Sequence, residues 1–372
     1  GTLGTLVSGG SASSLTTVTA TDDEGDSITF SVTSGSLPTG ITLNSNGTFS
    51  GNAGGVSSST TSTFVVTASD GTNTSTRQYT ITVNPAIVQL SGSGTFSVPS
   101  GINSAEILIV AGGASGSRSP NVSGGGGGAG GIVYRASYTF TATDKSSGIA
   151  YSVGAGGDGV GTGSGNAYDG GYRNGADTTF AISGGTITAK GGGGGAGYGG
   201  NSPHLSGFGA SYYAASQGGS GGGGAWEQTN GAASNQGTFS GWTSYGNSGG
   251  NRASGENYAG AGGGGAGGAG SNSTATVGGN GGVGQLFSSF TAYGESGYFG
   301  GGGAGGSQSD TVPQGGNGGG GNGGYGTGAT DRSGGNATDG TGGGGGGSRA
   351  IGYGTYTYKS GDGGNGTILL KY

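Results

Sequence analysis

Runs of four to six consecutive glycines recur between residues 112 and 366, and they constrain the fold of this chain more than any other feature. The runs are Gly124–Gly128, Gly191–Gly195, Gly221–Gly224, Gly262–Gly265, Gly300–Gly303, Gly318–Gly321 and Gly342–Gly347. Ordering glycine costs more backbone entropy than ordering any other residue, so a single run would stay disordered. Many runs side by side can satisfy one another's N–H and C=O groups, because backbones without Cβ atoms approach closely. We therefore expect a folded stack of left-handed polyglycine helices with polyproline II geometry.

The rest of the composition argues against a linker and excludes several classes of function. Aromatic residues are frequent (18 Tyr, 11 Phe and 2 Trp), whereas proline occurs six times and no Gly-X-Y repeat of collagen is present. A net charge of −6 with 11 basic residues does not predict nucleic-acid binding, and no apolar run is long enough for membrane insertion. The absence of cysteine excludes disulfides and zinc–thiolate sites. Because the chain begins with Gly1 and shows no signal peptide, we expect a fragment of a longer protein.

Residues 1–85 contain much serine and threonine and predict a separate domain. Segments with strand character are 15–20, 27–33, 40–43, 47–51, 62–68 and 77–83, and turn signals such as Asn46-Gly47 separate them. Short strands at this spacing predict an antiparallel β-sandwich. The motifs at 37–43, 47–51 and 79–84 resemble the immunoglobulin-like (cadherin-like) repeat of bacterial surface and phage proteins. We expect the usual first strand of that repeat to be cut short at Gly1.

Asn84-Pro85 marks the start of the second domain, residues 86–372. Ile87–Leu90 and Thr95–Val98 read as a hairpin, and Ile107–Ala111 is apolar on both faces, as in a central buried strand. The apolar segment Ile368–Leu370 lies at the other end of the region, and its pairing with Ile107–Ala111 would close the glycine-rich insert. The predicted strands that frame the glycine runs are about 87–111, 149–153, 178–190 and 367–372. The fold class expected is therefore all-β plus polyglycine II.

The order of motifs in residues 90–372 resembles the glycine-rich domain of phage tail fibres and secreted bacterial proteins. Phe96–Gly101 leads into a strand that ends in glycine, Val153–Gly157 follows, and Gly361–Tyr372 completes the pattern. The region also resembles the tail-fibre tip adhesins of T-even-like phages. This resemblance implies a sandwich of polyglycine II helices that presents variable loops at its tip.

Aromatic residues concentrate between the glycine runs, together with Ser, Gly and Asn, which is the composition of binding loops. Some of these rings must instead cover the lattice, which has no side chains of its own. The candidate receptor-binding residues are Tyr212, Tyr213, Trp226, Trp242, Tyr245, Tyr258, Phe290, Tyr293, Tyr298, Tyr353 and Tyr356.

One metal site is a candidate, and no catalytic site is. Asp22, Asp23 and Asp26, with Asp70 from another turn, offer oxygen ligands for Ca²⁺, the alternative being a solvated acidic turn. The single histidine, His204, lies in a loop, and the remaining carboxylates are scattered. We expect no enzymatic activity and no other cofactor.

These features predict an extracellular adhesin, on a virion or a cell surface, that recognises a host cell-surface protein or glycan. In the phage tail-fibre interpretation its other partners are tail-fibre subunits. Two alternatives stay open: a structural subunit of a filament or surface decoration, and a secreted bacterial polysaccharide-binding surface protein.

Overall fold

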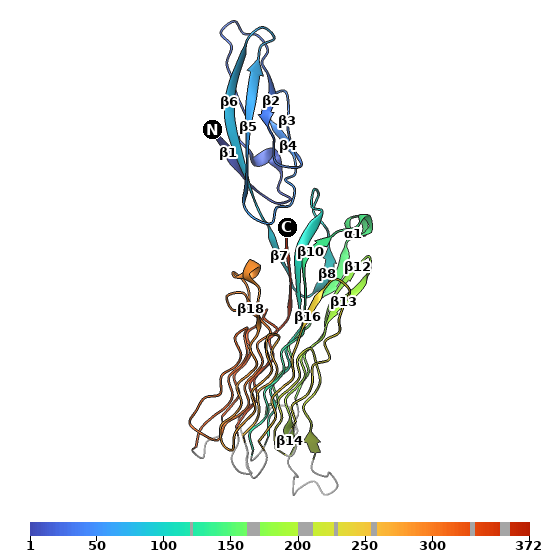
Figure 1. The fold of residues 1–372 in the computed structure, drawn as a ribbon, viewed down its shortest axis with the longest axis vertical. Coiled ribbons are helices and arrows are strands. Elements are labelled where there is room, and N and C mark those ends of the chain that lie inside the picture. Colours follow the sequence, from blue (N-terminus) through green and yellow to red (C-terminus); the bar gives the residue numbers. More distant parts are fainter. Residues whose placement is uncertain are drawn as a thin grey trace.

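The computed structural model describes residues 1–119, 122–161, 172–199, 211–226, 230–253, 259–327, 332–349 and 358–372. The molecule is nearly all-β, with an immunoglobulin-like sandwich at one end and the glycine-rich region extending from it (Figure 1). Chain elements of the sandwich are β1 (Thr2–Val7), η1 (Ala12–Ser14), β2 (Thr29–Gly35), β3 (Ile41–Leu43), β4 (Phe49–Gly51), β5 (Thr60–Ser69) and β6 (Thr74–Asn84).

The N-terminal sandwich packs a four-stranded sheet, β1-β6-β5-β2, against the β3-β4 hairpin. Alternate residues of β5 and β6 point inward, and Phe64, Val66 and Ile81 are buried in the resulting core. One prediction about this domain was wrong, because residues 15–20 form no strand. The first strand, β1, pairs in parallel with β6, which lies at the other end of the domain in sequence.

The second region begins with two sheets, ordered β16-β10-β9-β19-β7 and β13-β12-β11-β8. Its elements are β7 (Ile87–Leu90), β8 (Ser93–Phe96), β9 (Ser104–Val110), β10 (Ile132–Thr139), α1 (Ala142–Ser147), β11 (Ile149–Ser152), β12 (Thr178–Ile182), β13 (Gly185–Ala189), β14 (Gly197–Gly199), β15 (Ser211–Tyr213), β16 (Thr243–Tyr245), β17 (Gln285–Leu286), η2 (Ser288–Phe290), β18 (Tyr298–Phe299) and β19 (Thr367–Lys371). The predicted hairpin of β7 and β8 does not form. Gly92, at φ +66°, turns the chain so that β7 pairs with β19 in one sheet and β8 with β11 in the other.

The predicted closure of the glycine-rich insert is confirmed. β9 and β19 pair antiparallel from Thr367↔Val110 to Lys371↔Glu106. Every residue from Ile107 to Ala111 is completely buried, because both faces of β9 are covered. Ile107 and Ile109 face the second sheet, whereas Leu108 and Val110 face a layer formed by loop residues 285–299. β9, near the start of the glycine-rich region, and β19, at its end, therefore pair with each other in the middle of the five-stranded sheet.

Beyond the sheets, the glycine-rich segments between residues 111 and 366 run side by side and form what we call the glycine lattice (Figure 1). Along the central segment 124–131, successive N–H groups donate to three neighbours in rotation, at 2.7–3.0 Å, and the partner recurs every third residue. These three neighbours are 342–348, 190–196 and 261–264. Carbonyl groups of the same segment accept from three further neighbours, 303–306, 111–117 and 220–223. A three-residue repeat is the period of polyproline II, not the two-residue period of a strand.

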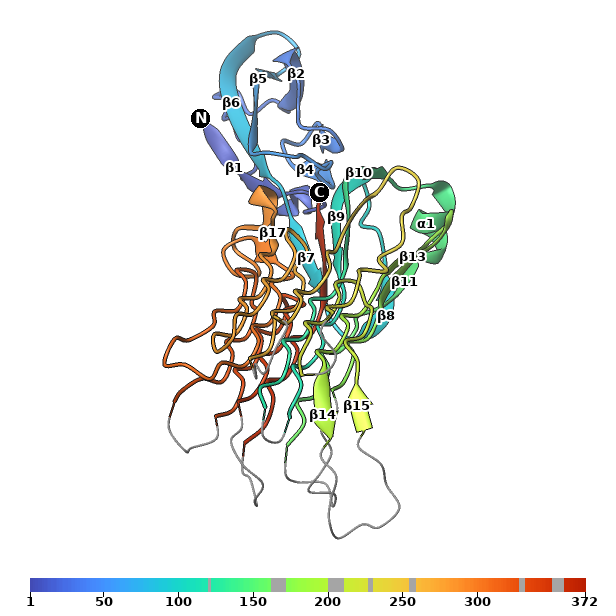
Figure 2. The same ribbon diagram turned by 60° about the horizontal axis from the view of Figure 1, so that its bottom comes forward.

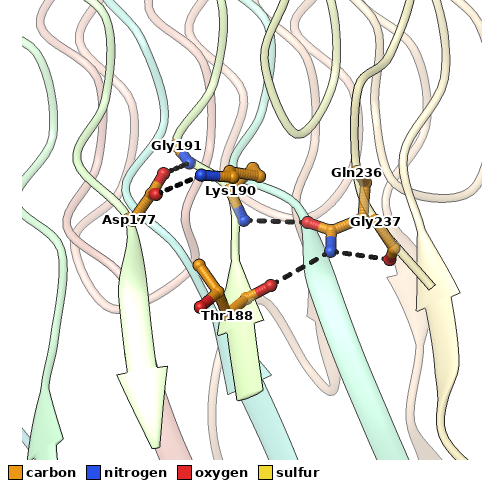
Figure 3. A network of polar contacts seen from close by, with 6 residues as sticks. All are labelled: Asp177, Thr188, Lys190, Gly191, Gln236 and Gly237. Carbon is orange, nitrogen blue, oxygen red and sulfur yellow. Dashed lines mark hydrogen bonds and ion pairs between the residues drawn. The ribbon is translucent and has the colours of Figure 1, made fainter. Parts of the chain in front are cut away.

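Side chains form hydrogen bonds to the backbone at the point where a strand ends and the lattice begins (Figure 3). Directly after β13, the Lys190 N–H donates to Gln236 Oε1 at 2.8 Å, and Gln236 Nε2 donates to the carbonyl of Thr188. Asp177 accepts from the Gly191 N–H at 2.8 Å and forms an ion pair of 2.7 Å with Lys190. These groups satisfy the backbone at the point where the hydrogen-bond period changes from two to three.

Along the outer segments of the lattice, Asn and Asp side chains spaced three residues apart also accept hydrogen bonds from backbone N–H groups. Asn365 and Asp362 accept hydrogen bonds from the N–H groups of Gly156 and Gly159, at 2.9 and 2.6 Å. Asn174 and Asp177 form a second such pair, toward Gly194 and Gly191. An outer segment has too few backbone neighbours, so every third residue supplies an acceptor from its side chain.

Candidate functional site

The lattice has two ends with different surroundings. One end meets the β-sheets and lies toward the immunoglobulin-like sandwich, and we call it the proximal end (Figure 1). The other end, the distal end, carries β14 and β15 and points away from the sandwich (Figure 2). Hydrogen bonds join Ala86 and Tyr372 in both directions, at 2.7 and 3.0 Å, so the chain enters and leaves the region at its proximal side.

Aromatic and arginine side chains pack together where lattice segments reach the distal end. The Arg252 guanidinium lies 5.7 Å from the centre of the Trp226 ring, and its Nη1 donates to the Trp226 carbonyl at 3.0 Å. Trp226 has a φ of +41°, a conformation that residues other than glycine rarely adopt. Similarly, Arg118 lies 4.7 Å from the centre of the Tyr358 ring, and both side chains are buried. These contacts fix the ends of the lattice segments with large, amphipathic groups.

Several predicted binding residues belong instead to the proximal end, where they pack over the outer face of β9 and β19. Phe290 is completely buried there, which corrects its assignment as a receptor-contact residue. Tyr245 and Tyr293 are partly buried against the same cluster, and Tyr245 stacks edge-on against Phe287 with ring centres 5.7 Å apart. Trp242 packs on the other core cluster. The glycine lattice offers no side chains to cover these strands, so loop aromatics do so.

The remaining predicted binding residues are distributed as follows. Tyr298 lies in β18, half-buried, beside η2 at the proximal end. Tyr212 and Tyr213 lie in β15 at the distal end, paired with Tyr198 and Gly197 of β14. Tyr258, Tyr353 and Tyr356 fall outside the described residues, as does His204.

The acidic turn does not assemble a calcium site. Asp22, Asp23 and Asp70 line one open hollow of about 440 Å³, but Asp22 accepts the Asp26 N–H at 2.9 Å and Asp70 accepts the N–H groups of Thr72 and Asn73. Those backbone hydrogen bonds hold the pKa of Asp70 below its usual value. Among the described residues, which include all four predicted ligands, no group of three or more His, Cys, Asp or Glu is placed to hold a metal ion. The carboxylates close their own turns instead.

One buried carboxylate organises the proximal end. Asp144 is 2% exposed and accepts hydrogen bonds from the Tyr138 hydroxyl at 2.8 Å, the Thr141 N–H at 2.9 Å and the Ser183 N–H at 2.8 Å. Burial alone would raise the pKa of Asp144, but the hydrogen bonds outweigh it and the pKa lies below its usual value. For Tyr138, burial and then the hydrogen bond to Asp144 raise the pKa to about 12. The network joins β10, α1 and the β12–β13 turn.

Sequence reasoning missed the side-chain acceptors along the outer lattice. The sequence pattern that could have predicted them is Asn or Asp at intervals of three residues, as in Asp362 and Asn365. No helix in the described part of the chain is long and apolar enough to cross a membrane.

Comparison with known proteins agrees with this two-part organisation. Residues 3–84 match a family model described as Putative Ig domain. A model described as Glycine-rich domain matches residues 88–372, which is more than half of the chain. A search of curated proteins found no match. The two domains are consistent with a surface or adhesin-type protein. Because this second match covers more than half of the chain, the chain belongs to the glycine-rich domain family.

Proposed function

We propose that this protein is an extracellular adhesin, the receptor-binding part of a phage tail fibre, whose distal end recognises a bacterial surface protein or glycan. The observation that carries the proposal is the arrangement of the molecule. A lattice held by backbone hydrogen bonds separates the sandwich from an end where β14, β15 and the Trp226–Arg252 pair lie. Recognition commonly resides in loops that a rigid scaffold positions.

The proposed scaffold is a stack of polyglycine II helices. Support comes from the three-residue hydrogen-bond repeat and from the six neighbours that surround segment 124–131. Such a stack resists bending because each backbone is tied to several others. Its described segments also end side by side without a conventional hydrophobic core.

Strain at Trp226 supports the choice of the distal end. Non-glycine residues with positive φ persist only where the surroundings enforce them, and they cluster at ligand-binding sites. Here the ring lies against Arg252, whose guanidinium holds the carbonyl of the same residue. Tryptophan and arginine are enriched among the residues that dominate protein–protein contacts. An aromatic ring can also pack on the C–H face of a sugar.

Whole-cell pull-down tests this proposal. The distal variant combines Tyr212→Ser, Tyr213→Ser and Trp226→Ser, and its matched proximal control combines Leu286→Ser and Tyr298→Ser. The purified proteins are incubated with a panel of bacterial strains, and cell-bound protein is quantified. We expect the distal variant to lose binding to the strain that captures the unmodified protein, while the control retains it. Equal binding by both variants would contradict a distal receptor site.

A structural filament subunit is the main competing function, and electron microscopy separates the two. The adhesin proposal predicts isolated elongated particles of one chain or a small closed oligomer. Filaments that lengthen with protein concentration would favour the structural role, because open-ended assembly requires repeated contacts between copies.

A further inference from the structure

A second candidate site lies at the proximal end of the lattice, away from the distal residues discussed above. It is a groove of about 380 Å³ between β10, the turn that joins β12 to β13, and the loop that precedes β16. Sites for small ligands begin at about this size. Its described lining residues include one cation, three aromatic rings and several hydroxyl groups, and apolar walls with a few polar groups are typical of ligand sites.

A tight turn presents two of the aromatic rings. The Trp242 N–H donates to the Phe239 carbonyl at 3.0 Å, and Gly241 has a φ of +76°, as the third position of a type II turn requires. Phe239 and Trp242 therefore stand on either side of the turn, both half-buried against the core. The Trp242 ring lies 6.0 Å from that of Tyr138, at an interplanar angle of 34°. Together the rings form an apolar wall whose position is fixed by the fold.

Among the described residues that line the groove, Arg135 is the only charged one. Its guanidinium lies 5.6 Å from the centre of the Tyr138 ring and 5.8 Å from that of Trp242, and its Nε donates to the Ser137 carbonyl at 3.2 Å. Within the described part of the chain, Arg135 takes part in no ion pair. A guanidinium held on aromatic faces is pre-organised for bidentate binding of a carboxylate or phosphate.

Hydroxyl groups complete the lining. Thr139, Thr141, Ser183 and Ser240 border the groove. The hydroxyls of Thr141 and Ser183 are bonded to Asp144 and to each other, so Thr139 and Ser240 are the ones that can donate to or accept from the hydroxyls of a ligand. The carboxylate of Asp144 accepts hydrogen bonds from the backbone of Thr141 and Ser183, which partly compensate its charge, and it lies behind these residues rather than in the lining of the groove.

We infer that this groove binds an anionic saccharide, with the sugar ring against Trp242 and its carboxylate or phosphate group on Arg135. The C–H groups on one face of a pyranose pack on an indole ring, and the remaining hydroxyls reach the Thr and Ser side chains. The site goes beyond the distal receptor site proposed above, and each can fail without the other because they lie at opposite ends of the lattice.

Tryptophan fluorescence of the full chain tests the inference. The chain has two tryptophans, so Trp226→Phe leaves Trp242 as the single reporter beside the groove. This protein is titrated with a glucuronic-acid disaccharide, with glucose 6-phosphate and with neutral maltose. We expect a saturable change in Trp242 emission with at least one charged sugar and a weaker response to maltose. The two charged probes distinguish carboxylate from phosphate recognition.

Variants of Arg135 provide the decisive comparison. Arg135→Gln should weaken binding about tenfold or more, since it removes a charge-assisted bidentate contact, and Arg135→Lys, which keeps the charge without the fork, should weaken it less. Arg77→Gln is the matched control, because Arg77 lies 5.5 Å from the Tyr79 ring in the N-terminal sandwich. The inference is overturned if neither charged sugar gives saturable binding, if maltose binds equally well, or if Arg135→Gln and Arg77→Gln behave alike.

Discussion

Replacing Gly127 with alanine would place a methyl group where the lattice has no room for one. A Cβ on Gly127 would overlap the backbone carbonyls of Ala114 and Ser115. Backbone atoms cannot rotate away as a side chain can, so segment 111–117 would have to shift. That shift breaks the hydrogen bonds from Ala114 N–H to Gly128, at 3.0 Å, and from Gly345 N–H to Ala114, at 2.8 Å.

The size of the effect follows from these two bonds. Breaking one buried hydrogen bond without replacing it costs about 1–3 kcal/mol, so the loss of two bonds costs about 2–6 kcal/mol. Alanine also restricts the unfolded chain, which offsets about 0.4–1 kcal/mol of that loss. We therefore expect Gly127→Ala to lower the free energy of unfolding by about 1–5.5 kcal/mol.

Chemical denaturation, followed by circular dichroism, measures this change against a matched control. Gly237→Ala adds the same methyl group at a position with nothing within 4 Å and without a positive φ. It should leave the free energy of unfolding within about 0.5 kcal/mol of the unmodified protein. If Gly127→Ala proved as stable as Gly237→Ala, the close packing of the lattice would be refuted.

Three further changes test other parts of the fold. Phe290→Ala should lower the free energy of unfolding by about 3–5 kcal/mol in the same denaturation assay, because the completely buried ring covers β9; a surface residue would cost far less. The pKa of Asp144 is depressed in the folded state, so its contribution is present above the ordinary value of 3.8 and is lost as pH falls through the folded pKa. Thermal melts of Asp144→Asn should therefore show a loss of stability near pH 7 that narrows below about pH 4, whereas a constant difference would exclude the linkage. Asn365→Ala should cost about 0.5–1.5 kcal/mol and speed hydrogen exchange at Gly156, whose N–H it leaves without its acceptor, while exchange at Gly127 should not change.

Much of the fold could be predicted because hydrophobic patterning is local. The run Ile107–Ala111 is apolar on both faces, and a run so short that leads into glycine is typical of a central strand covered on both sides. Its counterpart Ile368–Leu370 is equally apolar, and their pairing followed from their similarity. The recurrence of the glycine runs indicated a folded scaffold for the same reason, since only mutual packing could compensate the entropy of so much glycine.

Other features depended on contacts between distant segments, which local patterns do not encode. β7 and β8 are adjacent and strand-like, but the C-terminal strand β19 displaces β8 as the partner of β7. An aromatic residue in a loop can contact a ligand or cover a strand, and the sequence around Phe290 does not distinguish the two. The acidic turn gave a misleading signal because Asp22 and Asp70 bind their own backbones.

The glycine runs form an ordered, hydrogen-bonded scaffold, and amide hydrogen exchange along residues 124–131 provides a direct test of that order. Each of these eight consecutive N–H groups donates to the backbone of another segment. We expect all of them to exchange on the order of a thousandfold or more slowly than in an unfolded chain, because core hydrogen bonds open with free energies that approach the global stability. Gly71, in an exposed turn, should exchange without comparable protection. Exchange of residues 124–131 at the rate of Gly71 would show that the glycine runs are not held in an ordered lattice.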